Sequence, residues 1–134
     1  MTKNEVALIY ASWGWHVLPV LPNEKRPGNF NGLTGATTNI EQINEWWGKN
    51  PEFNIGVATG ARSNIMVYDI DPRNGGDVAW SQWVSENGQV PDGIMQLTAG
   101  GGIHHIAKYD SRFAKCQLVQ GVDLLAEGDR KSVV

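Results

Sequence analysis

The sequence predicts an α+β fold, in which a mostly antiparallel mixed sheet is flanked by helices. Apolar residues recur at helical spacing in the N-terminal half and in the middle of the chain, whereas the C-terminal part consists of short apolar runs separated by turn residues. The 134 residues, 41% of them hydrophobic and 19% charged, suit one domain with a single core and exclude a disordered chain. We therefore expect a single domain of the α+β class.

The elements are expected in this order: a helix over 4–15, a strand over 17–21, a loop over 22–39, a helix over 40–49, strands over 54–59 and 65–71, a helix over 77–87, and strands over 94–98, 103–109 and 121–126. Asn4 is a candidate cap for the first helix, and Thr38 or Asn39 caps the second. Pro19 indicates that the first strand lies at a sheet edge or ends early. The small residues of 60–64 join two apolar runs and predict a strand-turn-strand pair.

Composition and charge exclude several classes of protein. Cys116 is the only cysteine, so the chain can form neither an internal disulfide nor a cysteine-based zinc site. No apolar run approaches the roughly 20 residues of a membrane span, and no secretory signal begins the chain, which predicts a cytoplasmic protein. The net charge of -3 gives no general attraction for polyanions, so nucleic-acid binding must be local. An apolar run over 131–134 stops at the last residue, which predicts a domain that is incomplete at its C-terminus.

Two carboxylates stand at the end of one apolar strand. Asp69 and Asp71 are two residues apart, so on a strand their side chains point to the same face. Like charges at that spacing repel each other unless a cation or a shared proton lies between them. Hard cations such as magnesium prefer carboxylate oxygens. The pair therefore indicates a metal site, and the alternative is a turn in which both acids are solvated or cap the following helix.

A third acid and a glycine-rich turn add to this pattern. Asp123 is a single acid in an apolar strand, where a buried charge needs a partner such as a metal site; the alternative is an exposed strand edge. The glycines of 100–102 let the backbone approach an anion, although a simple hairpin turn fits them as well. His104 and His105 are adjacent, so only one of them can face a shared site, and His104 shares its face with Lys108.

Basic and aromatic residues offer further contacts. Arg62 in a small-residue turn and Lys25 in the long loop are candidates for phosphate binding, although each also fits a solvated loop. The six tryptophans suggest base stacking as one option. Four of them lie at helical spacing and are expected in the core: Trp46, Trp47, Trp80 and Trp83.

The order of these motifs resembles the N-terminal domain of the bifunctional DNA primase/polymerase family, which occurs on plasmids, phages and prophages and is related to archaeo-eukaryotic primases. Its diagnostic motifs are an Asp-x-Asp pair, a Gly-Gly-x-His strand and a lone Asp in a Gly-Val-Asp strand. They are matched here by Asp69 and Asp71, by residues 101–104 and by Asp123. The flanking segments that are similar to the family are 14–20, Lys25 with Pro27, the Ala-Thr signature of 35–39, Trp46-Trp47 and 54–60.

The resemblance implies a primase-polymerase-like fold with a catalytic core related to the RNA recognition motif, formed as one catalytic domain by residues 1–134. It implies that Asp69, Asp71 and Asp123 are the catalytic residues and the ligands of Mg²⁺ or Mn²⁺. His104 would contact the phosphates of the incoming nucleotide. The residues expected to assist in nucleotide binding are Gly101, Gly102, Arg62, Lys25 and Lys108.

The expected function is template-directed nucleotidyl transfer in the replication of a phage, plasmid or prophage element. In this mechanism two metal ions activate a 3′-hydroxyl and stabilise the pyrophosphate leaving group. The implied partners are nucleoside triphosphates, a single-stranded DNA template and a C-terminal or separate helicase domain, with no membrane. Two alternatives stay open: a metal-dependent nuclease or phosphoesterase, and a truncated, inactive remnant that binds nucleotide.

Overall fold

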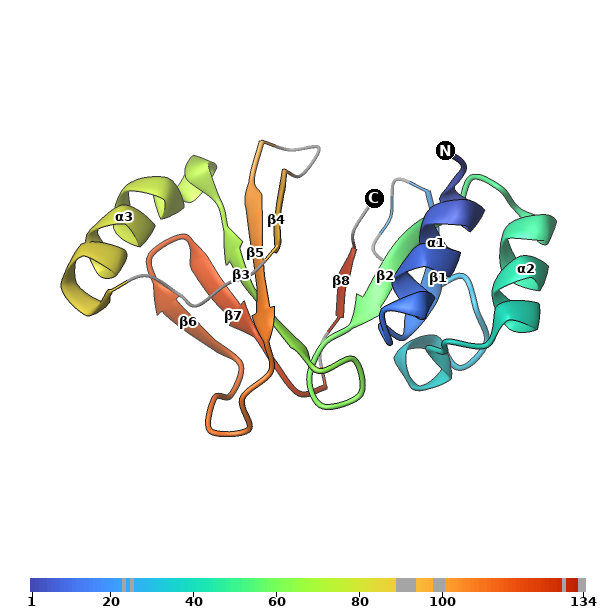
Figure 1. Ribbon diagram of the computed structural model, residues 1–134. Coiled ribbons are helices and arrows are strands. Elements are labelled where there is room, and N and C mark those ends of the chain that lie inside the picture. Colours follow the sequence, from blue (N-terminus) through green and yellow to red (C-terminus); the bar gives the residue numbers. More distant parts are fainter. Residues whose placement is uncertain (23, 25, 89–93, 98–100, 129, 133–134) are drawn as a thin grey trace. The chain divides into compact units, whose positions relative to one another are not determined.

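The computed structural model describes residues 1–22, 24, 26–88, 94–97, 101–128 and 130–132 (Figure 1). Contacts within the chain divide it into two compact units. Unit 1 comprises Met1–Ala58 with Arg130–Val134, and unit 2 comprises Thr59–Asp129. The described residues form three α-helices and two antiparallel sheets, which confirms the predicted α+β class. The prediction that residues 1–134 act as one catalytic domain is not tested by this division.

Unit 1 is a small sheet with two helices packed on it. Its elements are α1 (Lys3–Ser12), β1 (Val17–Val20), the 3-10 turn η1 (Gly32–Gly35), α2 (Ile40–Lys49), β2 (Asn54–Ala58) and β8 (Arg130–Ser132). The strand order is β1-β2-β8, so β1 is an edge strand, as Pro19 predicts. Helices α1 and α2 pack against each other and onto β1. Residues that form the buried core of this unit are Ala7, Val17, Leu18, Ile43, Trp47 and Ile55.

Local signals fix the helix starts in unit 1. Thr2, not Asn4, caps α1, because its side chain accepts from the Glu5 amide while the Glu5 carboxylate accepts from the Thr2 backbone. Helix α1 ends before Gly14, which takes a left-handed conformation at φ 86°, so it is shorter than the predicted 4–15. Asn39 caps α2 as predicted, with its Oδ1 accepting from the Gln42 amide at 2.9 Å.

Unit 2 is a five-stranded antiparallel sheet with one helix. Its elements are β3 (Ile65–Ile70), the 3-10 turn η2 (Pro72–Asn74), α3 (Gly76–Asn87), β4 (Ile94–Leu97), β5 (Ile103–Lys108), β6 (Cys116–Val119) and β7 (Val122–Leu125). The strand order is β4-β5-β3-β7-β6, which places β3 in the centre. Trp80 of α3 packs on a cluster of buried side chains from one face of this sheet: Met66, Tyr68, Ile70, Ala107, Val122 and Leu124. The other face carries the even-numbered residues of β5, beginning with His104.

The structure confirms the predicted strands over 54–59 and 65–71 and the turn between them, but the two strands do not pair with each other. Strands β2 and β3 belong to different sheets, and the isolated bridge between Gly60 and Ile65 lies in the segment after β2, within unit 2. The segment between them is bonded elsewhere, because the Thr59 hydroxyl donates to the Ala126 carbonyl and the Ala61 amide donates to the Glu127 carboxylate. These bonds tie the turn to the end of β7, so it cannot close a hairpin between β2 and β3.

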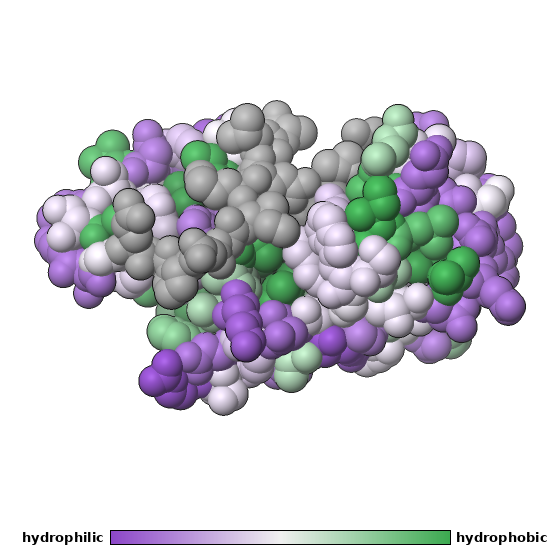
Figure 2. Space-filling view, viewed as in Figure 1, coloured by the Kyte–Doolittle hydropathy of each residue, from purple (hydrophilic) through white to green (hydrophobic). Residues whose placement is uncertain are grey.

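On the face shown in Figure 2, hydrophobic and hydrophilic residues are both exposed. In the part of the chain that the structure describes, the exposed large hydrophobic residues are Met1, Trp13, Phe30, Ile40, Val78 and Phe113. Single apolar residues at a surface are normal and do not by themselves indicate a partner. None of the helices that the structure describes has the length and apolar character needed to cross a membrane.

Candidate functional site

The central strand of unit 2 brings two acids and a histidine into one row. The register pairs Asp69 of β3 with His104 of β5 on one side and with Asp123 of β7 on the other. Directly opposed residues of antiparallel strands share a face, with Cβ atoms about 4.5–5.5 Å apart. The three side chains therefore form a line across the sheet, on the face opposite the α3 cluster. We call Asp123, Asp69 and His104 the acid–histidine row.

His104 is the most buried member of the row. Its side chain is 2% exposed, and its Nε2 lies 3.4 Å from Asp69 Oδ1. This distance suits an ion pair with a protonated imidazole but exceeds that of an ordinary hydrogen bond. Neither ring nitrogen has a hydrogen-bond partner among the described residues. Leaving a buried polar group unsatisfied costs roughly 1–3 kcal/mol, a cost that a hydrogen bond to a polar ligand or to water would offset.

His105 lies on the opposite face, as the alternation of side chains predicts. Its ring centre is 6.1 Å from that of Tyr68 and 6.0 Å from that of Trp80. Burial, with a smaller contribution from the nearby Cys116, raises the pKa of Tyr68, so its phenol stays neutral near pH 7. This face is therefore an aromatic packing layer, and only His104 belongs to the row.

Asp71 is placed differently from the other two acids. It lies just beyond β3 and caps η2: its Oδ1 accepts from the Arg73 amide at 2.9 Å, and its Oδ2 accepts from Asn74 Nδ2 at 2.7 Å. For Asp71, the contacts are thus those of the alternative in which the acid caps the following helix. Among the residues that the structure describes, no three His, Cys, Asp or Glu side chains are grouped closely enough to hold a metal ion. The structure brings Asp69 and Asp123 together but does not gather Asp71 with them.

The donor set of the row still suits a hard cation. Asp69 and Asp123 are like charges placed opposite each other on adjacent strands, an arrangement that destabilises a sheet unless a cation lies between them. Mg²⁺ is usually held by one or two carboxylates together with substrate phosphates and water. Asp123 is exposed although β7 is an inner strand. The expectation that this charge is buried is therefore wrong, and so is the alternative that it lies on an edge strand. Two carboxylates beside an imidazole without a hydrogen-bond partner therefore fit a site in which substrate phosphates and water would supply the remaining metal ligands.

The remaining predicted site residues fall into three groups. Gly101 and Gly102 directly precede β5, close to His104 in the chain, and Gly101 has a φ of 83°. Lys25 lies outside the described residues. Lys108 pairs with Ile65, four residues along β3 from Asp69, which corresponds to about 14 Å at about 3.4 Å per residue. Arg62 lies in the turn before Ile65, so the structure does not bring Lys108 or Arg62 to the row.

Gln117 is a residue of this sheet face that the sequence analysis missed. It lies on β6 directly opposite Asp123 and is exposed. A glutamine carries no strong sequence signal for a site. It could have been found only by recognising β6 as a strand and pairing it with β7.

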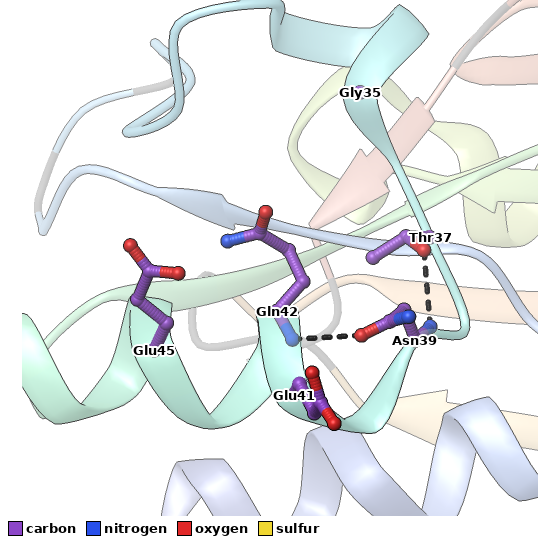
Figure 3. Close-up of a pocket in the computed structure, with 6 residues that line it drawn as sticks. All are labelled: Gly35, Thr37, Asn39, Glu41, Gln42 and Glu45. Atoms are coloured by element: carbon purple, nitrogen blue, oxygen red, sulfur yellow. Dashed lines mark hydrogen bonds between the residues drawn. The ribbon is translucent and has the colours of Figure 1, made fainter.

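The Ala-Thr signature of 35–39 has a structural role in unit 1. The Thr37 backbone bonds to Val17 at the start of β1, and its hydroxyl accepts from the Asn39 amide at 3.0 Å. Figure 3 shows the pocket at this helix start, with Glu41 and Glu45 among its lining residues. These carboxylates would repel a phosphate. The signature therefore sets the entry into α2 and gives no indication of a second nucleotide site.

A sheet face with paired carboxylates and an unpaired buried imidazole suits a protein that handles phosphorylated ligands. The family model for bifunctional DNA primase/polymerase, N-terminal (Prim-Pol), matches residues 7–134. The chain belongs to this family, because the match covers nearly its whole length. A search among proteins of curated function gave no match. Family membership indicates a function of the DNA primase/polymerase type, with nucleotides and DNA as the molecules bound.

Proposed function

We propose that the chain catalyses template-directed nucleotidyl transfer, extending a strand on a single-stranded DNA template from nucleoside triphosphates. The observation that carries this proposal is the acid–histidine row, which sets two carboxylates next to an imidazole whose nitrogens have no hydrogen-bond partner among the described residues. Membership of the primase/polymerase family supports the same reaction class. The role in replicating a phage, plasmid or prophage element, the helicase partner and the cytoplasmic location stay predictions from the resemblance and the composition.

In the proposed reaction, the acids of the row bind the metal and His104 binds the triphosphate. Asp69 and Asp123 would hold Mg²⁺ or Mn²⁺, which when bound neutralises phosphate charge and activates the attacking hydroxyl. A metal-ligand role of Asp71 stays a prediction from the resemblance, because both of its carboxylate oxygens accept hydrogen bonds within η2. His104 donates a hydrogen bond to a β- or γ-phosphate oxygen and thereby orients the triphosphate. Its burial excludes water from that contact and strengthens it. The primer 3′-oxygen bonds to the α-phosphorus while the bond to the β-phosphate oxygen breaks and pyrophosphate leaves.

Replacing His104 is expected to weaken triphosphate binding. A hydrogen bond to a charged group contributes about 1.5–3 kcal/mol, so His104→Ala should raise the KM for the triphosphate by roughly 10-fold or more and change kcat less. His104→Gln, which keeps a donor, should recover part of the loss. His105→Gln is the matched control, because His105 packs on the aromatic face. An equal rise in KM for both histidine variants would contradict the assignment.

The reaction itself is tested by incubating the purified chain with a primer annealed to a single-stranded DNA template, Mn²⁺ and labelled nucleoside triphosphates. Products longer than the primer, absent when a chelator is added, support the proposal. Shortened DNA would instead identify a metal-dependent nuclease or phosphoesterase. Unchanged DNA, with the triphosphate raising the unfolding midpoint in Mn²⁺, would identify a nucleotide-binding protein without this activity.

A further inference from the structure

We propose that Gln117 of β6 contacts the primer strand at its 3′ end, so that DNA enters the site from the β6 side of the sheet. This inference rests on the proposed function and adds the side of the row on which the DNA lies.

On its β6 side, the register of unit 2 extends the row by one residue. Gln117 is directly opposed to Asp123, so its side chain stands on the same face as the two acids and His104. The order across the sheet is therefore Gln117, Asp123, Asp69 and His104 on β6, β7, β3 and β5. The register of β6 shifts between Gln117 and Val119. Irregularities of this kind re-aim side chains and are over-represented beside active sites.

Burial changes from one end of the row to the other. The His104 side chain is 2% exposed and that of Asp69 is 25% exposed. Asp123 and Gln117 are both exposed. The histidine end therefore suits a small charged group such as the phosphate tail of a nucleotide, whereas the glutamine end is open enough for a polymer.

The chemistry gives the row a direction. In phosphoryl transfer the attacking and leaving oxygens are roughly in line on opposite sides of the phosphorus. If His104 holds the phosphates that leave, the attacking 3′-oxygen must approach from the other end, past Asp123. Gln117 is the next residue of the row in that direction. Its amide both donates and accepts hydrogen bonds, which suits the sugar and phosphate of a primer terminus.

The first test measures DNA binding apart from activity. Fluorescence anisotropy with a primer–template should give a Kd about 3- to 10-fold weaker for Gln117→Ala than for the parent chain, the loss expected for one hydrogen bond. The KM for the triphosphate should not change. Gln82→Ala is the matched control, because Gln82 lies on α3 and is bonded to Glu86 of the same helix. On template without a primer, the parent and Gln117→Ala should bind alike.

The second test measures proximity. In a Cys116→Ser background, a Gln117→Cys variant should form a disulfide with a primer whose 3′-terminal nucleotide carries a mixed disulfide, by exchange that releases the small thiol. A Gln82→Cys variant in the same background should not react. This inference alone would be overturned if the parent chain extends primers, Gln117→Ala binds primers normally and Gln117→Cys fails to react. A parent chain that neither binds nor extends primers would overturn the proposed function with it.

Discussion

Asp69→Asn is expected to lower nucleotide incorporation by at least about 100-fold while the chain stays folded. Asp69 is the central member of the row and faces both His104 and Asp123. Replacing groups that merely orient metal ligands costs 10- to 100-fold, so removing the charge of a ligand itself should cost more. The fold should tolerate the change, because Asn has the same shape and relieves the repulsion between Asp69 and Asp123. Single-turnover incorporation and thermal unfolding measure the two effects.

Asp110→Asn is the matched control for this prediction. It makes the same chemical change at an acid of the same unit, in the loop after β5. Side-chain and backbone hydrogen bonds from Arg112 lower the pKa of Asp110 to about 2, so this carboxylate is ionised at any practical assay pH. Incorporation by Asp110→Asn should match the parent rate. Unchanged incorporation by Asp69→Asn would reject the row as the catalytic site, and a large fall in its unfolding midpoint would assign Asp69 a structural role instead.

Alternation along strands made part of this site predictable from the sequence. It separates His104 from His105, and the structure places these two residues on opposite faces as expected. Alternation also predicts which side chains of its own strand share a face with Asp69, and likewise for Asp123. It cannot predict that the two strands are neighbours. The motif order supplied that expectation through the family resemblance. The structure adds the order of the residues within the row, from which we infer on which side of the row the primer lies.

Alternation fails where a strand ends. Strand β3 stops at Ile70, and Pro72 begins a 3-10 turn, so Asp71 leaves the strand geometry from which its shared face with Asp69 was predicted. Strand β6 was missed for a related reason. It has four residues, of which Cys116 and Gln117 are exposed, and this is too short a run to show a period of two.

The division into two sheets was hidden from the sequence because it depends on contacts between distant segments. The runs over 54–59 and 65–71 have the composition of a hairpin, and the turn residues between them fit one. Their separation depends on the bonds from Thr59 and Ala61 to Ala126 and Glu127 at the far end of the chain. Pairing of this kind follows from tertiary structure and leaves no local signal.

Gly76→Ala is expected to destabilise the chain by about 2–4 kcal/mol, because the backbone at the start of α3 leaves no room for a methyl group. A Cβ at Gly76 would lie 2.7 Å from the Asp71 carbonyl oxygen and closer still to that of Gly121. Both neighbours are backbone atoms, which cannot turn away as a side chain can. The Gly76 amide donates to the Asp71 carbonyl at 2.8 Å, and the Asp71 amide donates to the Gly121 carbonyl at 2.8 Å. Making room for the methyl group would therefore break the bonds that hold the Asp71 segment.

Gly48→Ala separates this steric effect from the general effect of the substitution. Gly48 lies inside α2, and a methyl group there would meet no atom of another part of the chain within 4 Å. Alanine at this position should therefore stabilise the helix by about 0.5–1 kcal/mol. Thermal unfolding should show a midpoint about 10 °C or more lower for Gly76→Ala and slightly higher for Gly48→Ala. A Gly76→Ala variant as stable as the parent would mean that the start of α3 does not lie against β3 and the β6–β7 turn. The contacts that position Asp71 would then have to be assigned again, because they pass through the same backbone atoms.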